Sequence, residues 1–320
     1  MNNAAAQPAR LVGDIGGSNT RLALFDATNN ELRAVQVYAN GDHACLEDII
    51  ERWLADLDDK APETCCLAVA APPFEDRVDM LNIEWSFSVR ELTQRFGFAA
   101  MRCINDFEGN ARALPHLRPA DLHVLRTGDP GNCRKLATLG PGTGLGGATL
   151  EFCVDTPVAN ASEPGHMGLA PATAEEIELF RALLPRHGEV HAELLLSGAG
   201  LVRLYRTLAQ VRGEPASDLE PAGVSAAGLS GESTLCADAL KVFCALLGSA
   251  CGDYVLTTGS YGGLYLAGGI VPRMVEFLAA SDFADRFATK GDMASHMSKV
   301  PLFVITSGVA GMLGAAHTPL

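Results

Sequence analysis

The sequence predicts an α/β protein with two domains. Segments with the alternating, β-branched pattern of strands are interspersed with segments of helical periodicity, which is typical of α/β folds. The chain has 320 residues, a length that exceeds that of a usual single domain, and 48% of its residues are hydrophobic, which is enough for a large buried core. Two strand–glycine turn–strand units, at residues 10–26 and 135–154, indicate a structural duplication.

The first glycine turn lies between two apolar strands, expected at residues 10–15 and 21–25. Asp14 stands at the end of the first strand, beside backbone N–H groups that the turn exposes. Such amides can form a nest for phosphate, and a neighbouring carboxylate can hold a hydrated Mg²⁺. For Asp14 alone, an aspartate that only accepts hydrogen bonds from the turn is an equally good interpretation.

The second turn, GPGTGLGG, contains the pattern G-x-G-x-x-G from Gly142 to Gly147. A dinucleotide-binding loop of that pattern requires a strand before it and a helix after it. Residues 135–139 can form the strand, but residues 148–154 alternate in polarity and predict a second strand. The loop is therefore expected to be a hairpin, and Thr143 with its glycines offers a second phosphate cradle.

The remaining elements follow from periodicity and from capping residues. We expect helices at residues 44–57, 89–96, 108–114, 174–184, 192–195, 200–210, 233–256 and 309–316, and strands at 65–71, 101–105, 264–267 and 300–305. Residues 214–221 are polar and proline-rich and predict a surface loop. The most apolar region, 242–271, is interrupted by Asp253 and several glycines, so we expect a buried helix running into a strand.

Composition excludes some classes of function. A net charge of -14 argues against a nucleic-acid partner and disfavours anionic membranes. The N-terminal stretch lacks the basic start and apolar centre of a signal peptide. The 9 cysteines are scattered without a C-x-x-C pair, which supports neither a zinc site nor a disulfide framework. We therefore expect a cytoplasmic protein that binds neither nucleic acid nor membrane.

Polar residues at loops supply further candidates. Asp106 follows a strand end, where a carboxylate can accept a proton from a sugar hydroxyl, although a helix N-cap is the better interpretation from the residues alone. Glu163 and His166 could contact vicinal hydroxyls, whereas a solvent-exposed loop is the simpler interpretation. Gly268-Gly269 would let a nucleotide approach the backbone closely. The alternative interpretation of these two residues is a plain strand-to-helix turn.

Six segments together resemble the bacterial ATP-dependent glucokinase family of actin-like sugar kinases. In chain order they are GDIGGSNTRLALFD, INDFEGNARALP, GPGTGLGG, SEPGHMGLAP, AELLLSGAGLVRLYR and LAGGIVPR. The resemblance covers nearly the whole chain. It implies two ribonuclease-H-like (actin-like ATPase) domains with a cleft between them: a small one of residues 1–115 plus 307–320 and a large one of residues 116–306. It also implies a homodimer.

The resemblance implies phosphorylation of D-glucose by ATP with Mg²⁺. Asp106 then matches the catalytic base, and Asn105, Asp106, Glu163, His166 and Glu193 match sugar ligands. Asp14 would hold the metal through water. Expected nucleotide-binding residues are Gly13, Asp14, Ile15, Gly16, Gly17, Ser18, Gly142, Thr143, Gly144, Gly268 and Gly269.

Two departures from the family pattern stand out. Related sugar loops usually carry glycine where this chain has Pro164, which fixes φ and removes an N–H. Residues 306–311 are less polar than in relatives and are expected to be structural.

A kinase for another hexose or one that uses polyphosphate is an alternative function. A sugar-sensing regulator is a third, disfavoured by the acidic charge and by the lack of a helix-turn-helix segment.

Overall fold

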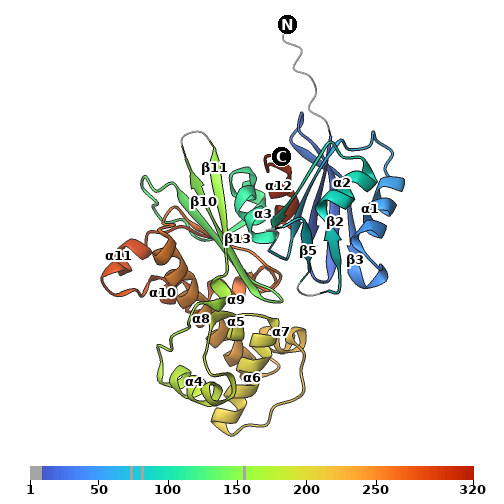
Figure 1. Ribbon diagram of the computed structural model, residues 1–320. Coiled ribbons are helices and arrows are strands. Elements are labelled where there is room, and N and C mark those ends of the chain that lie inside the picture. The colour runs from blue at the N-terminus through green and yellow to red at the C-terminus, as the bar shows by residue number, and fades with distance from the viewer. Residues whose placement is uncertain (1–8, 73–74, 81–82, 154–155) are drawn as a thin grey trace. The chain divides into compact units, whose positions relative to one another are not determined.

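The computed structural model describes residues 9–72, 75–80, 83–153 and 156–320. Val154, expected as the last residue of the second hairpin, and residues 1–8, which carry most of the signal-peptide assessment, lie outside these ranges. The chain divides into two compact units. Unit 1 comprises the described residues up to Arg118 together with Ser307–Leu320, and unit 2 comprises Pro119–Thr306 (Figure 1).

Each unit contains one large mixed sheet. The sheet of unit 1 has the order β3-β2-β1-β4-β7, formed by Glu31–Ala39, Asn19–Asp26, Arg10–Ile15, Thr64–Val69 and Ala100–Asn105. The sheet of unit 2 has the order β11-β10-β9-β12-β13-β8, formed by Pro157–Ser162, Leu145–Phe152, Lys135–Pro141, Leu264–Leu266, Leu302–Ile305 and Leu122–Arg126. A separate hairpin in unit 1 pairs β5 (Arg77–Asp79) with β6 (Ser86–Ser88).

The two sheets share one topology. In unit 1, β1, β2 and β3 pair antiparallel and β4 and β7 run parallel to β1; in unit 2, β9, β10 and β11 pair antiparallel and β12 and β13 run parallel to β9. Strand β8 is an additional antiparallel edge of the second sheet. The two glycine hairpins, β1–β2 and β9–β10, occupy corresponding places. The predicted duplication is therefore confirmed at the level of strand order. Strands β3, β8 and β11 were not predicted: β3 and β11 are largely exposed and β8 is mostly half-buried, so none of them shows a clear apolar face.

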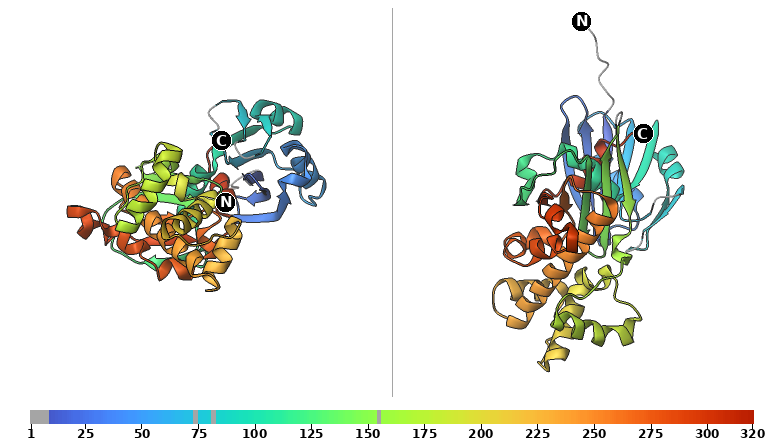
Figure 2. Two further views of the ribbon diagram at one scale, coloured as in Figure 1. Left: turned by 90° about the horizontal axis from the view of Figure 1, so that it is seen from below. Right: turned by 90° about the vertical axis from the view of Figure 1, so that its left-hand side faces the viewer.

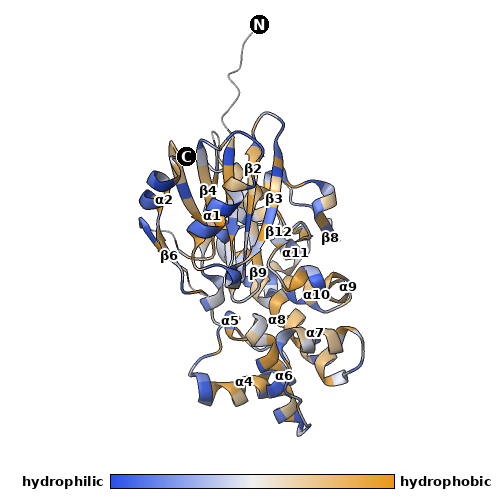
Figure 3. Cartoon of the chain, turned by 90° about the vertical axis from the view of Figure 1, so that its right-hand side faces the viewer, coloured by the Kyte–Doolittle hydropathy of each residue, from blue (hydrophilic) through white to orange (hydrophobic). Residues whose placement is uncertain are grey.

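Helices cover both faces of the sheet in unit 1. On one face, α1 (Leu46–Ala55) buries Leu46, Ile49, Ile50 and Trp53, while its remaining side is hydrophilic (Figure 3). The same face carries α2 (Val89–Phe96), capped by Ser88 and ended by Gly97 in the left-handed region. On the other face, α3 (Asp106–Ala113) lies beside α12 (Ala310–Ala316), as Figure 1 shows. Neighbouring strand residues therefore enter different cores.

Unit 2 carries the longest helix, α8 (Thr234–Thr258), at the centre of its apolar core. Among the described helices, this one is long and apolar enough to cross a membrane, yet 78% of its apolar window is buried inside the protein. This confirms the predicted buried helix. The other helices are α4 (Ala174–His187), α5 (Ala192–Leu195), α6 (Gly198–Arg212), α7 (Pro221–Leu229), α9 (Val275–Ala279), α10 (Phe283–Ala288) and α11 (Ala294–Met297).

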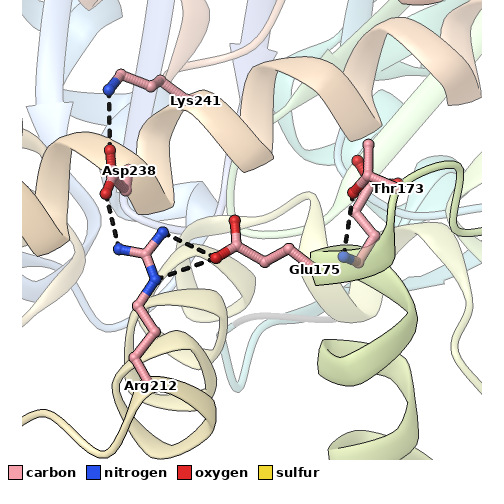
Figure 4. Close-up of polar contacts among 6 residues, drawn as sticks. Thr173, Glu175, Arg212, Asp238 and Lys241 are labelled. Carbon is pink, nitrogen blue, oxygen red and sulfur yellow. Dashed lines mark hydrogen bonds and ion pairs between the residues drawn. The ribbon is translucent and has the colours of Figure 1, made fainter.

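Helices α4, α6 and α7 gather at one end of unit 2 (Figure 2), and α5 lies between them and the sheet, since its Glu193 bonds Leu145 of β10. Ion pairs tie this group to α8. Arg212 of α6 bonds Glu175 of α4 at 2.8 Å and Asp238 of α8 at 2.7 Å, and Lys241 reaches Asp238 at 2.8 Å (Figure 4). One loop prediction was wrong by a residue, because Pro221 does not end the loop but begins α7, where proline is favoured at the first helical position.

Candidate functional site

The first glycine turn is braced by a residue that the sequence did not point to. Residues Gly16–Ser18 join β1 to β2, and Gly16 N–H donates to Asn19 O at 3.0 Å. The fully buried Asn40 donates from its Nδ2 to Gly16 O at 2.8 Å and from its backbone N to Ser18 O at 2.9 Å. Thr20 Oγ1 in turn donates to Asn40 Oδ1 at 2.8 Å. The turn is thus held in one conformation from behind.

Asp14 lies near the end of β1 beside this turn. Arg21, its register partner on β2, places Nη1 3.3 Å from Asp14 Oδ2. Burial raises the pKa of the Asp14 carboxyl, and the charge of Arg21 opposes that shift. A Cβ added to Gly311 of α12 would lie 2.9 Å from Asp14 Cγ, so only glycine fits there. Gly311 therefore has a packing role here, and the structural role expected for residues 306–310 stays a prediction.

Asn105 and Asp106 stand at the junction of β7 and α3. Asn105 is the N-cap, because its Oδ1 accepts the N–H groups of Phe107 at 2.9 Å and Glu108 at 3.2 Å. The interpretation of Asp106 as the cap is therefore wrong by one position. Asp106 is the first helical residue, and its Oδ1 also accepts Phe107 N–H at 2.9 Å.

These two parts of unit 1 lie along one edge of its sheet. The last residues of three parallel strands are paired in register, Ile15 with Val69 and Val69 with Asn105. Two strand spacings separate β1 from β7, which is roughly 10 Å. The first glycine turn and Asp106 therefore share the carboxyl edge of the sheet, where α/β folds bind ligands.

In unit 2, the second glycine turn contacts the Gly268-Gly269 segment. The turn is closed by Gly142 N–H, which donates to Gly144 O at 2.7 Å, and Thr143 is exposed at its tip. Gly268 has φ +84°, and a Cβ there would lie 2.4 Å from Pro141 O. Ile270 N–H donates to Pro141 O at 3.3 Å. The two loops therefore approach backbone to backbone, which larger side chains would prevent.

The turn that carries Glu163 and His166 packs on the same hairpin. Both side chains belong to exposed residues, next to the 3₁₀ turn Pro164–His166. A Cβ added to Gly147 would lie 2.7 Å from Pro164 Cγ, so the proline ring rests on β10. Before the turn, Ser162 Oγ and Tyr254 OH are 2.7 Å apart, which fastens the end of β11 to α8. Tyr254 was not predicted to contribute.

Glu193 connects these pieces. Its Oε2 accepts Leu145 N–H at 2.8 Å, at the end of the second glycine turn. A Cβ on Gly144 would lie 2.4 Å from the same oxygen, and a Cβ on Gly165 would lie 3.0 Å from it. One carboxylate thus touches both the glycine turn and the Glu163–His166 turn. Ser197 Oγ donates to Glu193 O at 2.9 Å and fixes α5 from its C-terminal side.

The predicted residues therefore form two groups. Unit 1 holds Asp14, the first glycine turn, Asn105 and Asp106. Unit 2 holds the second glycine turn, Glu163, His166, Glu193 and Gly268-Gly269. Asn40 and Tyr254 act behind these residues, and no local sequence pattern signals them, because their partners lie far away in the chain.

A family model and curated relatives identify one family, and solved structures share the fold. The family model "Glucokinase" matches residues 11–319. A glucokinase of Saccharophagus degradans is 38% identical over 309 residues, 96% of each chain. The crystal structure of a glucokinase from an Antarctic psychrotroph has a TM-score of 0.87 and 36% identity, covering 97% of this chain and 98% of that one. A ROK family glucokinase from Streptomyces griseus, solved with glucose and AMPPNP, shares the fold at TM-score 0.63 and 17% identity, covering 96% and 98%.

Proposed function

The chain belongs to the glucokinase family and has glucokinase activity, the phosphorylation of glucose, and we propose that ATP is its phosphoryl donor and Asp106 its general base. The sugar hydroxyl attacks the terminal phosphorus of ATP, its proton passes to the Asp106 carboxylate, and ADP leaves. For this transfer the protein must accept the proton of the sugar hydroxyl and hold the hydroxyl oxygen in line with the phosphorus.

One observation carries the proposal: Glu193 binds the second glycine turn and abuts the Glu163–His166 turn with the same carboxylate. A sugar ligand and a phosphate cradle that share one side chain are suited to bringing a hydroxyl and a phosphate together. Glu163 and His166 are exposed beside it and can supply an acceptor and a donor for further hydroxyls. Asn105 uses its Oδ1 as a helix cap, so its NH₂ group is the part suited to donate to the sugar.

The nucleotide is assigned to the backbone of the three glycine segments. The turn after β1 and the turn after β9 would hold phosphate oxygens, and Gly268-Gly269 would lie against the adenosine. Gly13, Asp14, Ile15, Gly16, Gly17, Ser18, Gly142, Thr143 and Gly144 are the residues concerned.

Asp14 fits a bound Mg²⁺, which would neutralise charge on the phosphates during transfer. Mg²⁺ usually retains several waters and takes one or two carboxylates together with substrate phosphates. A single carboxylate near the end of β1, oriented by Arg21 and largely buried, matches that donor set.

The two units are inferred to be ribonuclease-H-like domains, residues 1–115 plus 307–320 and residues 116–306. Their common strand order supports this inference. We further infer a cytoplasmic homodimer that binds neither nucleic acid nor membrane, with a net charge of -14 as the support for the latter. Light scattering of the purified protein tests the dimer.

The test of the base is Asp106→Asn. The amide keeps the shape and cannot take the proton, so kcat should fall by roughly 10²–10⁴ while glucose still binds. Asp58→Asn, at an exposed loop position, is the matched control and should leave kcat unchanged. A near-wild-type kcat in Asp106→Asn would remove Asp106 from the mechanism. The same coupled assay, run with glucose, mannose, fructose and N-acetylglucosamine and with ATP or polyphosphate, decides the donor and the breadth of substrates.

A further inference from the structure

A basic pocket of about 480 Å³ lies in unit 2 between the end of α4, one side of α6 and the segment that leads into α7. It is separate from every residue assigned above to glucose, phosphate or nucleotide. Its α6 side is a stripe at helical spacing that includes Ala199, Arg203, Arg206 and Gln210. Arg186 faces it from α4 and Glu220 from the segment before α7.

The stripe lies on the side of α6 that the apolar core leaves uncovered, where Arg203 is half-buried and Arg206 and Gln210 are exposed. Arg186 sits in the last turn of α4, where a cation also complements the helix dipole. That explanation does not extend to Arg203 and Arg206, which lie in the middle of α6. Concentrating three guanidinium groups in one pocket is notable in a chain of net charge -14.

The guanidinium groups retain capacity for a ligand. Arg186 Nη2 donates to Gln210 Oε1 at 3.0 Å, Arg206 Nη2 donates to Asp218 Oδ1 at 2.5 Å, and Arg203 Nη1 donates to the carbonyl of Leu194. Each guanidinium has five N–H donors, and within the described ranges each makes one such bond. Asp218 is 95% exposed, so water can replace it readily.

We propose that this pocket binds a small phosphate monoester and thereby changes the affinity of the enzyme for glucose. Three guanidinium groups stand against the lining carboxylate of Glu220 and the exposed Asp218 that pairs with Arg206, so the pocket keeps a net positive charge that suits an anionic ligand. Phosphate oxygens match the guanidinium fork. The volume suits a ligand of sugar-phosphate size. The Arg212 ion pairs to α4 and α8 keep the pocket walls in place.

Arg203 connects the pocket to the sugar. It donates to the carbonyl of Leu194, the residue after Glu193 in α5. At the start of α6, Gly198 N–H donates to Gly142 O at 2.9 Å, and Pro221 of the pocket packs 3.7 Å from the place of a Cβ on Gly198. A phosphate that draws Arg203 away from Leu194 loosens α5, and Glu193 then holds glucose less firmly.

The experiment is calorimetric titration of the full chain with fructose 6-phosphate in saturating ADP, once with glucose filling the site described above and once without glucose. Because the coupling is reciprocal, the phosphate ester should bind more weakly in the presence of glucose. Fructose is the uncharged comparison. Binding is expected for the phosphate ester and not for fructose, and it should weaken as salt is added. The double variant Arg186→Gln/Arg206→Gln should bind about tenfold or more weakly, since each position loses a charge-assisted hydrogen bond.

Arg181→Gln is the matched control, an arginine of α4 that pairs with Glu178, is 71% exposed and does not line the pocket. It should bind like the wild type. Saturating phosphate ester should raise the glucose KM of the wild type more than it changes kcat, and this effect should be absent in the double variant. Absence of binding, competition with ADP, or equal binding by the double variant overturns the site, and an unchanged glucose KM overturns the coupling.

Discussion

Replacing Glu193 should affect both substrates, whereas replacing Glu163 should affect glucose alone. Glu193 Oε2 accepts Leu145 N–H at 2.8 Å and lies against Gly144 of the phosphate turn, while Glu163 is an exposed residue beyond β11. A hydrogen bond to a charged group contributes about 1.5–3 kcal/mol and one to a neutral group about 0.5–1.5 kcal/mol. The change from carboxylate to amide at Glu193 should therefore cost the turn roughly 1–1.5 kcal/mol.

That cost corresponds to about a tenfold increase in the KM for ATP in Glu193→Gln. Glucose should lose a further hydrogen bond to a charge, about 1–3 kcal/mol, in both Glu193→Gln and Glu163→Gln. The KM for glucose should thus rise by about 5- to 150-fold in each variant. In Glu163→Gln the KM for ATP should stay within about twofold of the wild type.

Steady-state kinetics with one substrate varied at a time measures both constants. Glu189→Gln, four residues before Glu193 and with an 82% exposed side chain, is the matched control and should change neither KM. If Glu193→Gln shifts only the glucose KM, the contact with Leu145 does not support nucleotide binding. If Glu163→Gln shifts the KM for ATP instead of that for glucose, the assignment of its turn to the sugar is wrong.

The other predictions concern stability, pH and motion. Glu176 is 2% exposed and accepts two hydrogen bonds from Arg286, at 2.6 and 3.1 Å. Glu176→Ala should therefore lower the free energy of unfolding, measured by calorimetry, by about 3–5 kcal/mol. Glu178→Ala, at an exposed ion pair, should lower it by less than about 1 kcal/mol. Burial lowers the pKa of His317, which is stacked on His116, from 6.5 to about 4. The neutral form of His317 therefore stabilises the fold above pH 6.5, and this contribution is lost as the pH falls toward 4. In His317→Phe the melting temperature should depend less on pH over that window, and an unchanged slope would contradict the assignment. Glucose should draw the two units together and shrink the radius of gyration, with very slow ATP hydrolysis in its absence, and scattering curves that superpose with and without glucose would exclude closure.

The sequence by itself determined the local elements and the family. Three helices were located closely: α2, which Ser88 caps, spans the predicted residues 89–96, α5 spans the predicted 192–195, and α1 lies within the predicted 44–57. The glycine hairpins were recognisable because the residues after each turn alternate as strands do. These features depend on neighbours within a few residues, which a sequence displays directly.

Tertiary structure decided how those elements combine. Asn105 rather than Asp106 caps α3, because the backbone angles at the β7–α3 junction determine which side chain reaches the helical N–H groups. Asn40 braces a glycine turn that lies 24 residues before it. Strand β3 has mostly exposed side chains, so pairing with β2 rather than any polarity pattern makes it a strand.

The joint role of Glu193 was likewise invisible along the chain. Its partner Leu145 lies 48 residues away, and Gly144 and Gly165 are glycines that leave room for its carboxylate. A sequence indicates which side chains are capable of a given chemistry, because that depends on their functional groups. Which of them meet at 2.8 Å depends on strand pairing and helix packing, which sum many weak long-range contacts that no short stretch contains.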